Sequence, residues 1–290
     1  EVAAAGVNRA DLLQRLGKYP APAGTPQDIP GLEYSGVVAE VGAGPSQWKV
    51  GDAVMGLVPG AGMAQFVAVH AREAVPVPRG MSLEDAAGIP EAFFTAYDAA
   101  HLQCRLRMGD KILIHAVGSG VGTALLQLAL AAGAHVTGTS RTQQKLDLAA
   151  ELGLHEGILA EGGTFCPPEG QMDVVVDFVG RGYLESNLRA LKDRGTLIVV
   201  GLLGGRADEI NLGTILRRRL HIVGTALRAR PIEEKIKLAQ DFAARVVPGF
   251  EGPSPKFRPI VDTVLPMKDA ATAHAQLATN GTFGKIILSW

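Results

Sequence analysis

One segment near the middle of the chain restricts the possible fold more than any other. An apolar run, Lys111–His115, leads into glycines at positions 118, 120 and 122, and an Ala- and Leu-rich stretch from Thr123 to Ala132 follows at once. Glycine lets a backbone turn tightly and approach a pyrophosphate, while a helix N-terminus offers free N–H groups. The spacing departs from G-x-G-x-x-G, because Thr123 stands where the third glycine would be. Alone the loop would fit an ordinary tight turn, but the strand before it and the helix after it predict a dinucleotide site.

The next apolar run indicates which dinucleotide is bound. NAD-binding chains place Asp or Glu about 20 residues beyond the loop, where it binds the ribose 2′-hydroxyl. The stretch from His135 to Lys145 contains no acidic residue and carries Ser140, Arg141 and Lys145 instead. A guanidinium and an ammonium attract a 2′-phosphate, which a carboxylate would repel. The prediction is therefore NADPH rather than NADH, with a solvated helix start as the alternative interpretation.

Residues 87–253 share a pattern that defines their fold class. Apolar runs without alternation, typical of parallel strands buried on both faces, recur at 111–115, 135–137, 173–177, 196–200 and 221–223. Helix-like segments separate these runs, so we predict an α/β domain with a doubly wound parallel sheet of the Rossmann type. Further glycine turns follow strands at Gly180 and Gly201. Each is typical of a plain turn, but together with the first loop they are predicted to line one crevice.

The flanking residues 1–86 and 254–290 have a different character. Short β-like stretches separated by Gly and Pro turns predict an irregular β barrel or sandwich, with strands at 34–41, 52–56 and 65–69. Near the end, strands at 260–265 and 284–288 enclose a short helix at 268–278. We therefore predict an α/β domain inserted into a β domain, with the last segment returning to the first. The chain begins without Met, in what reads as a strand, and we expect further residues before Glu1.

Composition excludes several classes of function. Apolar residues make up 47% of the 290 residues, which rules out wholesale disorder. A net charge of −1 predicts no nucleic-acid partner, although Arg217–Arg219 with Arg228 and Arg230 leave an NADPH-binding sensor or RNA-binding module open as an alternative. Two cysteines are too few for a disulfide framework. The chain shows neither a membrane-spanning run nor a signal peptide, so a cytoplasmic protein is expected.

Several ordered motifs carry a family resemblance. They are Ala5–Pro20, Pro30–Glu33, Ile89–Tyr97, Ser119–Thr123 and Gly284–Ile287. Together they resemble the zinc-independent NADPH:quinone oxidoreductases of the medium-chain dehydrogenase/reductase superfamily, and most of all the stress-inducible subgroup. The similarity covers essentially the whole chain. It implies a GroES-like β-barrel domain plus a Rossmann domain, with the cofactor in the cleft between them.

The resemblance also implies residue roles. Tyr19 and Asn8 would line the nicotinamide and quinone pocket and donate hydrogen bonds to the reacting oxygen, although a packing Tyr beside Pro20 and a turn-forming Asn are the simpler interpretations. The expected cofactor-binding residues, from the patterns and the resemblance together, are Thr95, Ser119, Gly120, Val121, Gly122, Ser140, Arg141, Lys145, Gly180, Gly201, Leu202, Phe283, Gly284 and Lys285.

The implied reaction is hydride transfer from NADPH to a quinone without a metal. Where zinc dehydrogenases of similar architecture carry Cys and His ligands, this chain has Asn8, Arg9 and Leu32. A quinone is already electrophilic and needs positioning more than a Lewis acid. An NADPH-dependent reductase of activated C=C bonds, such as enones or enoyl thioesters, stays open because its hydride geometry is similar. The resemblance also implies a homodimer joined through the predicted edge strand His221–Ala226.

Overall fold

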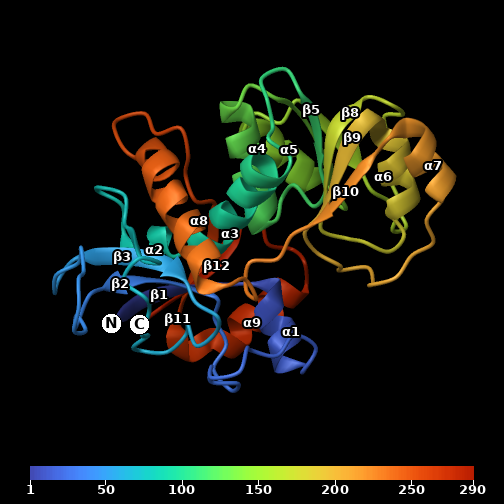
Figure 1. The fold of residues 1–290 in the computed structure, drawn as a ribbon. Helices are drawn as coiled ribbons and strands as arrows, with labels where there is room; N and C mark the ends of the chain where they lie inside the picture. The colour runs from blue at the N-terminus through green and yellow to red at the C-terminus, as the bar shows by residue number, and fades with distance from the viewer. The chain divides into compact units, whose positions relative to one another are not determined.

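The computed structural model describes residues 1–290, which form two compact units. The β unit contains Glu1–Thr95 and Leu227–Trp290, and the α/β unit contains Ala96–Ala226. The order of the two units along the chain follows the predicted insertion. The boundaries lie at 95 and 227 rather than at the predicted 86 and 253, because two helices expected in the inserted domain pack with the β unit. Figure 1 shows these helices, α3 and α8, lying side by side.

A six-stranded sheet forms the base of the β unit, in the order β11-β12-β1-β2-β3-β4. The strands are β1 (Val2–Val7), β2 (Glu33–Val37), β3 (Ala53–Leu57), β4 (Val75–Pro76), β11 (Val261–Pro266) and β12 (Lys285–Ser289). Strand β12 pairs antiparallel with β1, with Gly6 opposite Ile287. The prediction that the last segment returns to the first is therefore confirmed.

The predicted strand at 65–69 is wrong. This segment is irregular, and Phe66 is 63% exposed. It makes one backbone contact with the sheet, in which Val2 N donates to Gln65 O over 2.8 Å. Strand β1, the strand that this segment touches, already pairs with β12 and β2, so the segment does not join it as a further strand.

Helices complete the β unit: α1 (Arg9–Arg15), α2 (Leu83–Ala86), α3 (Pro90–Tyr97), α8 (Ile232–Arg245), α9 (Ala270–Ala278) and the short turns η2 (Val247–Phe250) and η3 (Met267–Asp269). On α8, Phe242 is fully buried and its ring lies 4.2 Å from that of Phe94 on α3, centroid to centroid. This contact explains why the chain rejoins the β unit before α8. Helix α1 lies inside the Ala5–Pro20 motif, where no helix was predicted.

The α/β unit contains a second six-stranded sheet, in the order β10-β9-β8-β5-β6-β7. Its strands are β5 (Lys111–Ile114), β6 (His135–Ser140), β7 (Glu156–Leu159), β8 (Met172–Asp177), β9 (Leu191–Val199) and β10 (His221–Gly224). Every pairing is parallel, so the predicted doubly wound Rossmann sheet is confirmed. Strand β7 was not predicted, because it is a largely exposed edge strand without an apolar run.

Helices cover both faces of the parallel sheet. Helices α4 (Gly120–Ala131) and α5 (Gln143–Glu151) lie on one side in Figure 1, and α6 (Leu184–Ala190) and α7 (Leu212–Arg218) lie on the other. A π-helical turn, η1 (Asp98–Gln103), precedes β5. The central strands β5 and β8 are almost entirely buried, as expected for a sheet covered on both faces.

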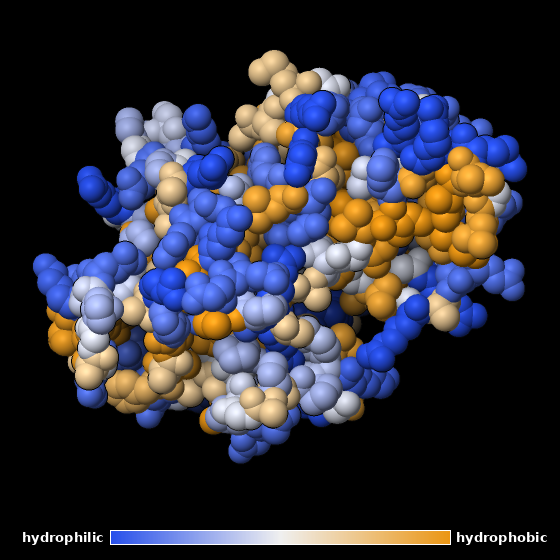
Figure 2. All heavy atoms as spheres, in the orientation of Figure 1, coloured by the Kyte–Doolittle hydropathy of each residue, from blue (hydrophilic) through white to orange (hydrophobic).

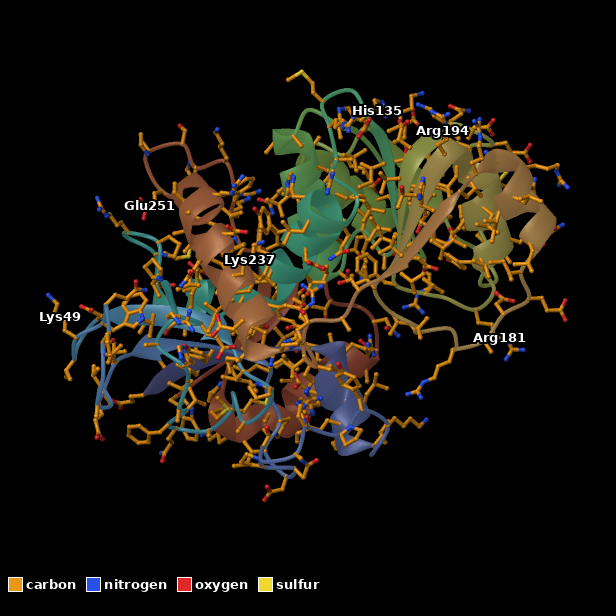
Figure 3. The ribbon with its side chains drawn as sticks, viewed as in Figure 1. Lys49, His135, Arg181, Arg194, Lys237 and Glu251 are labelled. Atoms are coloured by element: carbon orange, nitrogen blue, oxygen red, sulfur yellow. The ribbon has the colours of Figure 1, made fainter.

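Side chains mark the two ends of this sheet in Figure 3. His135 and Arg194, at the amino ends of their strands, lie at one end, and Arg181, which follows β8, lies at the other. Ligands of open α/β sheets bind outside the carboxyl ends of the strands. None of the helices combines the length and the apolar composition needed to cross a lipid bilayer.

Candidate functional site

The glycine loop after β5 is built to leave a helix N-terminus open. Ser119 is the N-cap of α4, and its hydroxyl oxygen accepts a hydrogen bond from Gly122 N over 3.0 Å. A Cβ atom at Gly122 would lie 2.7 Å from the carbonyl oxygen of Val117, so only glycine fits where the helix passes under the loop. Val117 N in turn donates to Thr139 O of β6 over 3.0 Å. The loop therefore presents the first turn of α4 at the carboxyl ends of β5 and β6, in a form that fits a pyrophosphate.

Three predicted phosphate-binding residues lie together at the end of β6. Ser140 ends the strand and is 6% exposed, and its hydroxyl accepts from Thr142 N over 3.3 Å. Arg141 follows and is exposed, while Lys145 lies in the first turn of α5. No acidic side chain stands between Ser140 and Lys145. This arrangement fits a nucleotide that carries a 2′-phosphate.

Tyr183 lies near Arg141 at the end of β6, and the sequence did not reveal this position. Burial raises the pKa of its phenol, and the nearby Arg141 guanidinium partly offsets that rise. The ring packs against Phe165 at 5.0 Å and against His115 at 4.8 Å between centroids. An aromatic residue between a helix start and a strand end has no periodic signature, which is why the sequence did not reveal it.

A buried polar chain ties the ends of the central strands together. His115 Nε2 lies 2.7 Å from Asn187 Oδ1, and Asn187 Nδ2 donates to Asp177 Oδ2 over 3.1 Å. Because Asn187 accepts through its oxygen, His115 donates from Nε2 and accepts at Nδ1 from Thr139 Oγ1, 2.9 Å away. Burial lowers the pKa of His115 to about 4, so the imidazole is neutral at pH 7.

The same hydrogen-bonded side chains hold the glycine turns at Gly180 and Gly201. Asp177 Oδ1 accepts from Gly180 N over 3.1 Å, and Gly180 forms a parallel bridge with Gly205. Gly201 begins the second turn, and Leu202 beside it contacts Gly180 and is 45% exposed. The turns after β8 and β9 thus lie against each other at the carboxyl end of the sheet, next to the strand that leads into the first loop.

The β unit contains a cluster of buried charges around Asn8. Lys285 Nζ donates to Glu33 Oε1 at 2.6 Å, to Asn8 Oδ1 at 2.5 Å and to Val7 O at 3.2 Å. Asn8 Nδ2 donates to Glu33 Oε1 over 2.8 Å and to Gly6 O over 3.2 Å. Glu33 is fully buried and Lys285 is 4% exposed. This ion pair and amide form a closed internal network.

The network engages two residues that were predicted to meet the substrate or the cofactor. Asn8 already donates both amide protons to protein oxygens, so it has none left for a substrate oxygen. The ammonium of Lys285 is likewise surrounded by three protein acceptors. In this structure both residues hold the ends of β1, β2 and β12 together, and their roles toward a substrate and a cofactor stay predictions.

Two further carboxyls lie near this network. Asp11 caps α1, accepting from Asn8 N at 2.7 Å and from Gly31 N at 2.9 Å, and burial raises its pKa to about 6. Glu91 lies at the start of α3, where burial and the charge of Glu33 raise its pKa to about 8. Its backbone N–H donates to Glu33 Oε2 over 2.8 Å. Glu91 therefore holds its proton at neutral pH, and sequence reasoning had assigned it no role.

The remaining predicted residues lie in the β unit. Tyr19 is half-buried in an irregular loop, and the guanidinium carbon of Arg228 stands 4.8 Å from the centroid of its ring. Thr95 on α3 is 8% exposed. Phe283 is half-buried and its N–H donates to Asp262 Oδ1 over 2.9 Å, and Gly284 follows it into β12. No three His, Cys, Asp or Glu side chains gather in an arrangement that could hold a metal ion.

Comparisons with known proteins agree with this geometry. Residues 1–79 match the alcohol dehydrogenase GroES-like domain family, and residues 120–245 match the zinc-binding dehydrogenase family. The quinone oxidoreductase of Rattus norvegicus is 30% identical over 99% of this chain and 87% of the rat protein. The 2-haloacrylate reductase of a Burkholderia species is 30% identical over 98% of this chain and 88% of that protein.

A solved structure shows the same likeness in three dimensions. The quinone oxidoreductase of Thermus thermophilus, also solved in complex with NADPH, matches with a TM-score of 0.81 and 30% identity, over 100% of this chain and 90% of that chain. A GroES-like unit interrupted by a parallel Rossmann sheet, with its glycine loop before α4, defines an NAD(P)-dependent oxidoreductase of the medium-chain dehydrogenase/reductase superfamily. Within that superfamily the chain belongs to the zinc-independent quinone oxidoreductase family.

Proposed function

We propose that this protein uses NADPH to reduce a quinone by hydride transfer. The observation that carries the proposal is the end of β6 near the N-terminus of α4, where the sequence from Ser140 to Lys145 supplies Arg141 and Lys145 and contains no acidic residue. That pairing suits a pyrophosphate and a 2′-phosphate in one ligand. The relatives named quinone oxidoreductase support the choice of acceptor.

Tyr19 is the side chain we assign to the acceptor. Bound NADPH would supply a hydride, and reduction of a quinone to a hydroquinone then needs one proton in addition. The phenol of Tyr19 donates a hydrogen bond to the quinone oxygen that gains negative charge, and water provides the proton. Burial raises the pKa of Tyr19 above its usual value, so the phenol stays protonated and remains a donor through the neutral range.

The charged cluster around Lys285 supports a reaction without a bound metal. The carboxylates of Asp11 and Glu33 already accept hydrogen bonds from backbone N–H groups, and Glu33 is also neutralised by the ammonium. A carboxylate engaged in this way is not available as a metal ligand without breaking a buried ion pair. We expect treatment with a chelator to leave the rate of NADPH oxidation unchanged, and a loss that zinc restores would contradict the proposal.

A second candidate is the reduction of an activated C=C bond. The relative named 2-haloacrylate reductase favours it, because it is as identical to this chain, at 30%, as the quinone oxidoreductase of rat. Hydride delivery to such an alkene needs the same cofactor placement and a similar stabilised oxygen.

A panel of acceptors separates the two candidates. NADPH oxidation is followed by absorbance with quinones and with enones of similar size, and kcat/KM is compared within one enzyme preparation. We expect kcat/KM for the best quinone to exceed that for the best enone by about tenfold or more, a difference of about 1.4 kcal/mol in transition-state binding. The reverse order would assign the protein to C=C reduction.

We also propose that two copies of the chain associate through β10. This strand is the edge of the parallel sheet, and Ile222 on it is 40% exposed. On the adjoining α7, Leu212 is 70% exposed and Leu216 is 78% exposed. Figure 2 shows hydrophobic atoms gathered over this end of the α/β unit. An unprotected edge strand beside exposed apolar side chains favours pairing with a second copy.

A further inference from the structure

The guanidinium of Arg228 uses all of its nitrogens within the β unit. Nε donates to Pro59 O over 2.7 Å, Nη1 donates to Tyr19 O over 3.1 Å, and Nη2 donates to Gln14 Oε1 over 2.6 Å. Arg228 also lies over the ring of Tyr19, with its guanidinium carbon 4.8 Å from the ring centroid. Arg228, which the sequence analysis grouped with a cluster of arginines, is therefore half-buried, and each of its three side-chain nitrogens donates a hydrogen bond.

The segment that Arg228 contacts has no regular secondary structure, and side chains rather than a helix or sheet ladder hold much of it, among them Gln14 and Gln27. From Gly17 to Ile29 the chain forms turns and irregular backbone, without a helix or a strand, and we call this segment the Tyr19 loop. Tyr19 N makes one long hydrogen bond to Leu13 O, at 3.3 Å. The phenol ring of Tyr19 thus depends on its surroundings for a fixed direction.

Arg228 connects the Tyr19 loop to two well-anchored partners. Gln14 on α1 is 8% exposed, and its Nε2 donates to Gln27 O over 3.2 Å at the far end of the loop. Gly60, beside Pro59, packs so closely that a Cβ atom there would lie 2.7 Å from Thr25 Cγ2 and 3.5 Å from Arg228 Nη2. A planar guanidinium matches three acceptors in fixed directions, which a lysine ammonium does not.

The charge of Arg228 acts on the phenol as well. The pKa of Tyr19 is raised by burial, and the positive charge of Arg228 lowers it again, whereas Glu91 adds to the rise. The guanidinium therefore makes the phenol a stronger hydrogen-bond donor than burial alone would allow. The same side chain sets both the direction and the acidity of the group assigned to the acceptor.

We propose that Arg228 is a positioning residue for Tyr19, holding the ring by stacking and the backbone by hydrogen bonding so that the phenol points at the electron acceptor. The inference rests on the role of Tyr19 in the proposed function. It assigns Arg228 to the acceptor side of the reaction, with no part in nucleotide binding.

A double-mutant cycle tests the catalytic half of this proposal. Arg228→Lys keeps the positive charge but loses the planar three-way bonding. We expect it to lower kcat with quinone by about tenfold, as misplacing a positioned group does, while KM for NADPH stays within about twofold. Combining Arg228→Lys with Tyr19→Phe should be no slower than Tyr19→Phe alone, because both remove the same contact. Additive losses would overturn the proposal.

A spectroscopic measurement tests the structural half without relying on activity. The chain has four tyrosines, so ring-labelled protein gives few ¹H–¹³C signals, and Tyr19→Phe identifies the signal of Tyr19. In Arg228→Gln we expect that signal to move toward the position of a solvent-exposed tyrosine while the other signals stay. Arg72→Gln, which breaks an exposed ion pair with Glu233 in the same unit, is the control and should move none.

The two measurements separate the possible failures. An unmoved Tyr19 signal in folded Arg228→Gln would overturn the positioning role, whatever the rates. A moved signal together with a full rate in Tyr19→Phe would instead remove Tyr19 from the reaction, and with it the catalytic purpose assigned to Arg228. A cooperative thermal unfolding transition shows that each variant is folded. If Arg228→Gln does not fold, the spectroscopic measurement is made on Arg228→Lys instead.

Discussion

At the scale of single residues, the least expected feature is the number of charges buried together in the β unit. Asp11, Glu33 and Glu91 lie around one ammonium, that of Lys285. One cation cannot balance three carboxylates out of water, so protons must remain on some of them. At neutral pH such a proton lies on Glu91, whose pKa is raised to about 8, whereas Asp11, with a pKa raised to about 6, is mostly ionised.

The proton on Glu91 has a consequence for stability. Its pKa is about 8 in the folded protein against 4.5 for an ordinary glutamate. Between these values the unfolded chain releases the proton and the folded chain keeps it, so the contribution of Glu91 to stability is lost as the pH rises from 4.5 to 8. We expect Glu91→Gln to melt at a higher temperature than the wild type at pH 8, with the difference shrinking toward pH 5.

Thermal unfolding across that pH range checks the expectation. The control is Glu84→Gln on α2, an exposed glutamate in the same unit, whose melting temperature should follow that of the wild type at every pH. Curves for Glu91→Gln and the wild type that run parallel from pH 5 to pH 8 would show that Glu91 ionises normally.

The choice of nucleotide is also decided at single residues. Replacing both Arg141 and Lys145 with Ala removes the two cations at the end of β6. We expect KM for NADPH to rise by about tenfold or more and KM for NADH to change by less than about twofold, because only NADPH carries the 2′-phosphate. Steady-state kinetics with both cofactors measures this.

A matched control is available at the opposite end of the sheet. Arg107 is exposed just before β5, at the amino end of the strands, and Arg107→Ala should leave both KM values unchanged. Equal rises for the two cofactors in the double variant would place the 2′-phosphate elsewhere.

At the scale of elements, the two helix starts of the nucleotide site differ in a way the sequence did not reveal. Ser119 caps α4 through its side chain, whereas Thr142, the N-cap residue of α5, makes no side-chain hydrogen bond to the helix. The N-terminus of α5 is instead flanked by the Ser140 hydroxyl, which accepts from Thr142 N.

This difference predicts unequal effects of the same substitution. Ser119→Ala should destabilise the α/β unit by about 1 kcal/mol, the usual loss for an N-cap, and Thr142→Ala should cost clearly less. Urea unfolding followed by far-ultraviolet circular dichroism gives the two midpoints. A larger loss for Thr142→Ala would mean that the cap of α4 contributes little.

At the scale of the whole molecule, the exposed edge of the parallel sheet makes a prediction about assembly. If β10 joins two copies, Ile222→Lys should convert a particle of twice the 30.3 kDa chain mass into one of the chain mass. A buried charge without a partner is costly at such an interface, while the isolated unit loses nothing. Light scattering after size-exclusion chromatography measures the mass.

The other sheet offers the control for this experiment. Val264 on β11 is 46% exposed and also lies on an edge strand, and Val264→Lys should leave the mass unchanged. A wild type already at the mass of one chain would refute association through β10.

Local patterns in the sequence were enough to predict the parallel sheet, the glycine loop and the return of the last strand. Apolar runs such as Asp173–Asp177 and the strand–glycine–helix order at Gly122 are properties of neighbouring residues, and they determine the local secondary structure. The strand predicted at 65–69 is wrong because a strand also needs a partner strand to pair with, and this segment meets the sheet only through the hydrogen bond from Val2 N to Gln65 O, which no local pattern records.

Only the tertiary structure decided what the polar side chains do. Lys285 meets Asn8 across 277 residues, and Arg228 meets Tyr19 across 209. Residues so far apart share no periodicity, so the sequence could name Asn8 and Tyr19 as candidates but could not show that one is already fully hydrogen-bonded while the other is held in place. The fold class follows from local hydrophobic order, whereas the site follows from which distant segments the chain brings together.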